Sequence, residues 1–89
     1  MQRRFPSRQR VSARIPPPAD GRRLFAANLQ RLRRAARVTQ EQLAEATGLD
    51  RSYISLVENA HANVSLDNIC RIATVLRVRP DELLQPGER

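Results

Sequence analysis

The sequence is poor in the residues on which disulfides, metal sites and membrane spans depend. It contains one cysteine, Cys70, and one histidine, His61, so an internal disulfide is impossible and we expect neither a metal ion nor another cofactor. No apolar run approaches the roughly 20 residues of a membrane-spanning helix. We therefore expect a cytoplasmic protein without membrane contact, in which Cys70 fills space in the core.

Residue combinations typical of catalysis are also missing. The chain has no Ser–His–Asp set, no paired carboxylates and no glycine-rich phosphate loop, so we expect it not to be an enzyme. Only three of the 89 residues are aromatic, whereas 40% are hydrophobic. This composition favours one small helical domain packed with leucine, isoleucine, valine and alanine.

Lysine is absent, and the sixteen arginines are unevenly distributed. Residues 1–23 contain seven of them against one acidic residue, Asp20, together with four prolines and no apolar periodicity. We expect this segment to be a disordered Arg/Pro-rich tail. Three interpretations stay open: a non-specific arm for nucleic acid, a solvated extension that could contact a partner protein, or a segment upstream of the true start.

Residues 24–84 have a periodicity that predicts an all-α domain of five helices, followed by a short polar end at residues 85–89. The first helix begins near Leu24 and runs to about Arg37, because apolar residues recur there at steps of three and four. Its inward face is formed by Phe25, Leu29, Leu32 and Ala36.

The second and third helices are short and close together. Thr39 and Gln42 have the spacing of a capping box, which predicts a helix start, and Gly48 predicts its end. Asp50 is expected to cap the next helix, which ends near Glu58.

The fourth helix is expected after a loop, with Ser65 as its cap and an apolar face that ends at Leu76. Pro80 suits the first turn of a short fifth helix, "PDELL", which ends at Leu84. No segment of the sequence predicts a strand.

Two short helices joined by a glycine-containing turn are typical of a helix-turn-helix. The run "TQEQLAEATGLDRSYISLVEN" closely resembles the Cro/C1-type (XRE-like) helix-turn-helix regulators, and the resemblance covers residues 24–84. The segment "YISLVENAHANVSLDNI" is similar to small controller proteins of restriction–modification systems. The resemblance implies a compact lambda-repressor-like domain that binds double-stranded DNA and is associated with the nucleoid.

The expected third helix has an unusual outer face. At about 100° per residue, one side has short polar groups around a single cation, namely Arg51, Ser52, Ser55 and Leu56. Ile54 and Val57 lie on the opposite side, where they can pack on the core. Arginine can donate two hydrogen bonds to guanine, serine can contact base edges, and leucine can contact a thymine methyl group. An ordinary solvated face is the alternative, but the preceding helix and the resemblance favour base recognition.

Four further residues are candidates for DNA contacts. Tyr53 could either pack at the helix edge or contact bases, and the resemblance to controller proteins favours bases. Gln40 begins a helix, where free backbone N–H groups suit a phosphate, and the matching family residue binds one. Asn63 and Ser65 are candidates for the same role, with loop turning and helix capping as the alternatives.

The resemblance also implies a structural salt bridge between Arg33 and Glu58, which would connect the first and third helices. Two departures from the family are notable. Asn59 and Ala60 stand where many members have glycine, so we expect Asn59 to adopt any left-handed conformation needed there. Ala62 replaces a frequent arginine, which removes one expected DNA contact and leaves the operator sequence open.

Leu83 and Leu84 are adjacent on a helix too short to bury both. We expect Leu83 to seal the core and a homodimer interface to form from Leu76, Val78, Leu83 and Leu84, with Leu84 central. The function expected is a sequence-specific transcriptional regulator on a palindromic operator. The alternatives are the antitoxin of a toxin–antitoxin pair, or a protein-bridging module that does not read bases.

Overall fold

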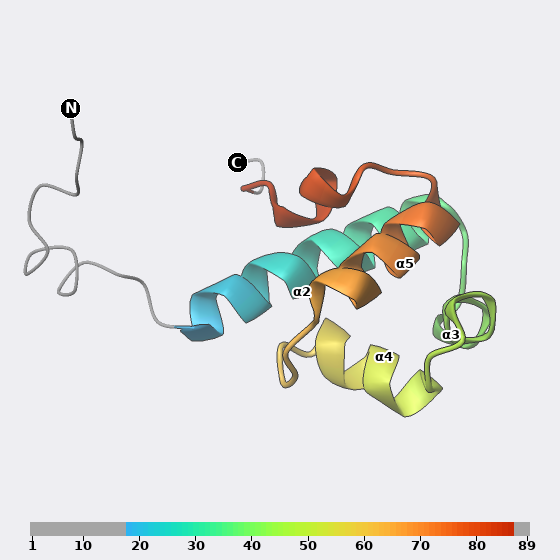
Figure 1. Cartoon of the computed structure of the whole chain (residues 1–89), viewed down its shortest axis with the longest axis horizontal. Helices are drawn as coiled ribbons and strands as arrows, with labels where there is room; N and C mark the ends of the chain where they lie inside the picture. Colours follow the sequence, from blue (N-terminus) through green and yellow to red (C-terminus); the bar gives the residue numbers. More distant parts are fainter. Residues whose placement is uncertain (1–17, 87–89) are drawn as a thin grey trace, which may run out of the picture.

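The computed structural model describes residues 18–86, so the expectations for residues 1–17 and 87–89 lie outside the described residues. Within this range the chain forms α2 (Pro18–Ala35), α3 (Gln40–Thr47), α4 (Arg51–Glu58) and α5 (Leu66–Leu76), and ends in a 3₁₀ helix, η1 (Pro80–Leu84) (Figure 1). No strand occurs among the described residues. The predicted all-α fold is confirmed, although the fifth helix is a 3₁₀ helix and not an α-helix.

The first helix begins earlier than expected, at Pro18 and not at Leu24. Proline is tolerated in the first turn of a helix, because its missing N–H would have no partner there. The next turn contains Gly21, Arg22 and Arg23, which carry no apolar marker that periodicity could detect. Residues 18–23, expected to be part of a disordered tail, are therefore helical.

Packing places α2 against α4 and η1, while α5 packs against α3 and η1, and α3 packs against α4. The core is formed by buried apolar side chains from all five elements, among them Phe25, Leu29, Leu43, Ile54, Val57, Ile69, Ile72, Leu76 and Leu83. Each fully buried side chain of this size contributes about 1.5–3 kcal/mol relative to exposure. Because α4 has core residues along only one side, its other side remains available at the surface.

The ends of α3, α4 and α5 have, with one exception, the capping residues that the sequence predicted. Thr39 and Gln42 form the capping box, and Gly48 ends α3 in the left-handed conformation at φ 79°. Asp50 is at the N-cap of α4, but its side chain makes no capping hydrogen bond, so that part of the prediction is wrong. Ser65 caps α5 by accepting a hydrogen bond from the backbone N–H of Asn68 at 3.1 Å.

Two expectations about single residues are wrong. The left-handed residue after α4 is Ala60 at φ 61°, whereas Asn59 has φ −99°. Asn59 continues the end of the helix, since its backbone N–H donates to the carbonyl oxygen of Ser55 at 3.1 Å. Its Nδ2 donates to the same oxygen at 2.8 Å, and the chain reverses one residue later. Cys70 is exposed, because it lies about 100° around the helix from the buried Ile69.

Candidate nucleic-acid interface

The outer face of α4 has the division that its sequence predicted. Ile54 and Val57 are buried in the core. Arg51 and Ser52 are exposed, and Leu56 is 47% exposed although it is a large apolar residue. The helix therefore presents a cation, a hydroxyl group and an apolar side chain on a surface that the core does not use; Ser55 is half-buried at its border.

Arg51 has a partner that the sequence analysis missed. Its Nε atom lies 3.2 Å from Oε2 of Glu41 on α3, and both side chains remain largely exposed. The contact bridges the two helices across the turn at residues 48–50. The available signal was positional: Glu41 is the second residue of α3, Arg51 is the first of α4, and only three residues separate the helices.

Tyr53 is half-buried and connects α4 to the loop before α5. Its hydroxyl group donates a hydrogen bond to the carbonyl oxygen of Asn63 at 3.0 Å and accepts one from Nδ2 of Asn68 at 3.4 Å. The hydroxyl is thus already used within the domain, which leaves only the ring for a contact with DNA.

Gln40 differs from the expectation of a free side chain at the start of α3. Its Nε2 atom donates to Oε1 of Glu58 at 3.0 Å, so the side chain is directed to a partly buried network. Thr39 accepts from the backbone N–H of Gln42 at 3.0 Å, which satisfies one donor of the first turn. One amide donor of Gln40 is thus used within the domain, while the backbone N–H groups of the first turn remain suited to a phosphate at this helix end.

The salt bridge between Arg33 and Glu58 is present and buried, as expected. Two guanidinium nitrogens bind two carboxylate oxygens, Nε to Oε2 at 2.5 Å and Nη2 to Oε1 at 2.9 Å. Nη1 of Arg33 also donates to the backbone carbonyl oxygen of Val38 at 2.8 Å. Nε2 of Gln30 donates to the backbone carbonyl oxygen of Glu58 at 2.8 Å. The hydrogen bond to Glu58 raises the pKa of Arg33, so the guanidinium stays charged.

Asn63 and Ser65 are both exposed, in the loop between α4 and α5 and at the N-cap of α5. Their structural alternatives are realised: the carbonyl oxygen of Asn63 accepts from Tyr53, and the hydroxyl group of Ser65 caps α5. The side-chain amide of Asn63 and the open N-terminal turn of α5 remain available for a phosphate.

Comparison with known proteins agrees with this geometry. The helix-turn-helix family HTH_3 matches residues 29–83. This chain belongs to that Cro/C1-type helix-turn-helix family. The family is one of DNA-binding transcription regulators, which is not a class of enzymes.

Several relatives of this helix-turn-helix chain have been described. Control protein C.BamHI from Bacillus amyloliquefaciens is 42% identical over 64 residues, covering 71% of this chain and 79% of the relative. The crystal structure of the restriction–modification controller protein C.AhdI from Aeromonas hydrophila is 47% identical with a TM-score of 0.68, covering 70% of this chain and 94% of that one. The hypothetical transcription factor NHTF from Neisseria is 38% identical with a TM-score of 0.74, covering 82% and 84%.

The residues expected at a dimer interface of this helix-turn-helix domain separate into two groups. Leu76 and Leu83 are buried within their own domain, and Leu83 seals the core as expected; their place in a dimer interface stays a prediction. Leu84 is 46% exposed and Val78 is half-buried, so these two remain available. Leu66, at the start of α5, is 75% exposed, although its spacing had placed it on the apolar face of that helix.

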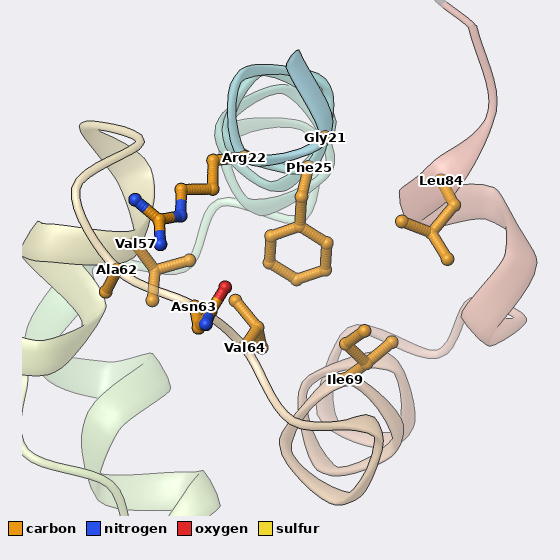
Figure 2. A pocket seen from close by; sticks show the side chains of 9 residues that line it. All are labelled: Gly21, Arg22, Phe25, Val57, Ala62, Asn63, Val64, Ile69 and Leu84. Atoms are coloured by element: carbon orange, nitrogen blue, oxygen red, sulfur yellow. The ribbon is translucent and has the colours of Figure 1, made fainter. Parts of the chain in front are cut away.

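A small cavity lies beside the helix-turn-helix, between the start of α2, the loop at residues 62–64, α5 and the end of η1 (Figure 2). Phe25, Val64 and Ile69 line it, with Leu84 facing them from η1. Its volume of about 210 Å³ is below the range of roughly 300–1,000 Å³ typical of ligand pockets.

Within residues 18–86, no helix is long and apolar enough to cross a bilayer.

Proposed function

We propose that this protein is a sequence-specific regulator of transcription that inserts α4 into the major groove of double-stranded DNA. The proposal rests on the outer face of α4, where Arg51, Ser52 and Leu56 are exposed on a helix whose other side is buried. Arg51 donates to O6 and N7 of a guanine, and Leu56 contacts a thymine methyl group. Ser52 and Ser55 contact base edges, and the ring of Tyr53 lies against the border of the same surface.

Phosphate contacts on either side of the groove orient this helix. The backbone N–H of Gln40, at the start of α3, and the N-terminal turn of α5 after Ser65 supply partial positive charge for two phosphates. Asn63, exposed in the intervening loop, donates from its amide group. Such contacts position a protein on DNA without reading sequence, so specificity depends on α4.

The protein acts as a homodimer on a palindromic operator. One helix-turn-helix contacts only a few base pairs, and two-fold symmetry doubles the readout when the recognition helices are about 34 Å apart. Leu84 is central to the interface, supported by Val78, because both lie at the surface near the C-terminal end of the described residues. An isologous contact of this kind is the commonest form of a small homo-oligomer.

We further propose that the regulated genes are those of a restriction–modification system. Two similar proteins, C.BamHI and C.AhdI, are controllers by name. The antitoxin alternative predicts a toxin gene beside this one, whereas a controller predicts a methyltransferase and a nuclease. A protein-bridging module would need no arginine and serine face, so the outer face of α4 disfavours that alternative.

Selection of bound sequences from random duplex DNA tests the proposal directly. The full chain should enrich an inverted repeat with half-site centres about 10 base pairs apart. The variant Arg51→Ala, selected in parallel, should relax the preference at a guanine in each half-site. Absence of any enriched sequence would contradict sequence-specific binding, and enrichment of a single half-site would contradict the dimer.

Two leucine variants test the interface. Leu84→Glu should produce folded monomers in sedimentation, with operator affinity little better than half-site affinity, because a buried charge opposes association. Leu66→Glu is the matched control, since it changes a more exposed leucine on a different helix and should leave the dimer intact. A dimer that survives Leu84→Glu but not Leu66→Glu places the interface on α5.

A further inference from the structure

We infer that Glu41 is a positioning residue for Arg51, which orients the guanidinium for guanine before DNA is bound. The inference rests on the proposed function, and it assigns a role in specificity to a residue outside the reading helix. The observation is the ion pair across the helix-turn-helix, with 3.2 Å between Nε of Arg51 and Oε2 of Glu41.

The pair has no evident structural purpose. The side chains of Arg51 and Glu41 are 56% and 66% exposed, so neither fills space in the core. The packing of α3 on α4 depends instead on buried residues such as Leu43 and Ile54. An exposed ion pair contributes only about 0–1 kcal/mol to stability, which makes it a poor device for holding two helices together.

Its geometry does suit recognition. The carboxylate of Glu41 approaches the Nε side of the guanidinium. The terminal nitrogens, Nη1 and Nη2, are therefore left for the paired acceptors O6 and N7 of guanine. An arginine side chain loses rotamer freedom when it binds, and an ion pair formed beforehand reduces the loss that remains. The guanidinium is thus preorganised for one base.

Glu41 also opposes contacts with the wrong partner. It lies in the first turn of α3, near the backbone N–H of Gln40 where a phosphate is proposed. A carboxylate there repels the phosphate backbone of any sequence, and it competes with phosphates for Arg51. Among the base edges of the major groove, only guanine offers Arg51 two acceptors, O6 and N7. The ion pair should therefore increase the ratio of specific to random binding.

The test is a double-mutant cycle between Glu41→Gln and Arg51→Met, measured by fluorescence anisotropy on the selected operator, a single half-site and random duplex DNA. Glu41→Gln should weaken half-site binding about threefold, which is within the range of an exposed ion pair, and full-operator binding by roughly the square of that factor. Affinity for random DNA should stay equal or rise. In the Arg51→Met background, Glu41→Gln should cause no operator-specific loss.

Glu45→Gln is the matched control. Glu45 lies one turn further along α3, is exposed, and has no ion pair within the described residues. It removes the same charge from the same helix, so its effect on operator binding should be neutral or slightly favourable. If Glu45→Gln also weakened half-site binding threefold, the effect of Glu41→Gln would be due to the overall charge of α3 and not to the contact with Arg51.

A base substitution in the operator distinguishes a positioning role of Glu41 from an effect on helix stability. With 7-deazaguanine at the contacted base, N7 is removed and only O6 remains for Arg51, so the difference in affinity between the wild-type protein and Glu41→Gln should become smaller. If Glu41→Gln weakens binding equally with and without Arg51, the positioning role is wrong while the proposed base contact stands. If Arg51→Met itself binds the operator as tightly as the wild type, the base contact is wrong, and the positioning role with it.

Discussion

Two arginine–glutamate pairs each include one residue of α4, and they differ in burial, in hydrogen bonding and in their position on the helix. Arg33 and Glu58 are buried, and they are connected by two parallel hydrogen bonds with additional partners on both sides. Arg51 and Glu41 are exposed and meet through a single contact. One pair is at the C-terminal end of the helix and attaches it to α2, while the other is at the N-terminal end and faces solvent.

The difference indicates how one short helix can be fixed and still remain available. Charges that are buried and fully hydrogen-bonded have no donor left for another molecule, and removing one of them leaves the other unpaired in a poorly solvated site. Exposed charges exchange partners with little loss, because water and a ligand can both replace the contact. The buried pair attaches α4 to α2, and the exposed pair is the one that the proposed function places at DNA.

Removal of the buried carboxylate should have the largest effect. Glu58→Ala is expected to lower the free energy of unfolding by about 3–5 kcal/mol, because Arg33 would remain buried without a counter-charge. Urea unfolding followed by circular dichroism measures the change, and Glu41→Gln, measured alongside, should change stability by less than about 0.5 kcal/mol. Equal effects of the two variants would remove the distinction between the pairs.

Removal of the exposed arginine should leave the fold intact and change recognition. Arg51→Ala is expected to lose about 1–3 kcal/mol of binding free energy on the selected operator, with little loss on random DNA. Thermal unfolding should be unchanged, because the side chain is largely exposed. Equal losses on both DNAs would indicate that Arg51 binds a phosphate and not a base.

Features that depend on local sequence were predictable. The capping box at Thr39 and the left-handed Gly48 follow from residue types at fixed spacings, and the structure has both. The inward position of Ile54 and Val57 follows from helical periodicity. The salt bridge to Glu58 was different, because only the family resemblance pointed to it; periodicity places a residue on a face but does not name its partner.

Features that depend on tertiary context were not predictable. Gln40 was expected at the surface, but the buried carboxylate of Glu58 attracts its amide group. Leu76 was expected at an interface, but it is buried within the domain, on a helix that packs against α3 and η1. Cys70 lies at the edge of the apolar stripe of α5, where spacing does not decide between core and surface. The partner of Arg51 was missed because Glu41 lies on another helix.

Relief of backbone strain next to the buried pair should stabilise the fold without affecting the exposed pair. Ala60, two residues beyond Glu58, has φ 61°, which costs a non-glycine residue roughly 1–2 kcal/mol. Glycine removes this strain, but its greater freedom in the unfolded chain offsets part of the gain. The free energy of unfolding of Ala60→Gly, measured with urea, should therefore rise by about 0.5–1 kcal/mol. Ala62→Gly, a change outside the left-handed positions, should give no gain. Operator affinity should be unchanged in both.

A third pair joins Arg79, at the N-cap of η1, to Asp81 in its first turn. It should have the smallest effect and serves as a reference for the other two. The hydrogen bond from Arg79 lowers the pKa of Asp81, so the pair stabilises the fold above the ordinary pKa of a carboxyl group and this contribution is lost as the pH falls through the lowered pKa. Both groups are exposed to water, which screens the attraction, so Asp81→Asn should lower the melting temperature only slightly at neutral pH. Operator affinity should also be unchanged, in contrast to Glu41→Gln, because this pair is far in sequence from the reading helix and has no proposed DNA contact. Parallel melting and anisotropy measurements on the two variants check this contrast. If Asp81→Asn lost as much operator affinity as Glu41→Gln, the loss could not be due to a position beside α4. Removal of any exposed arginine–carboxylate pair would then weaken operator binding.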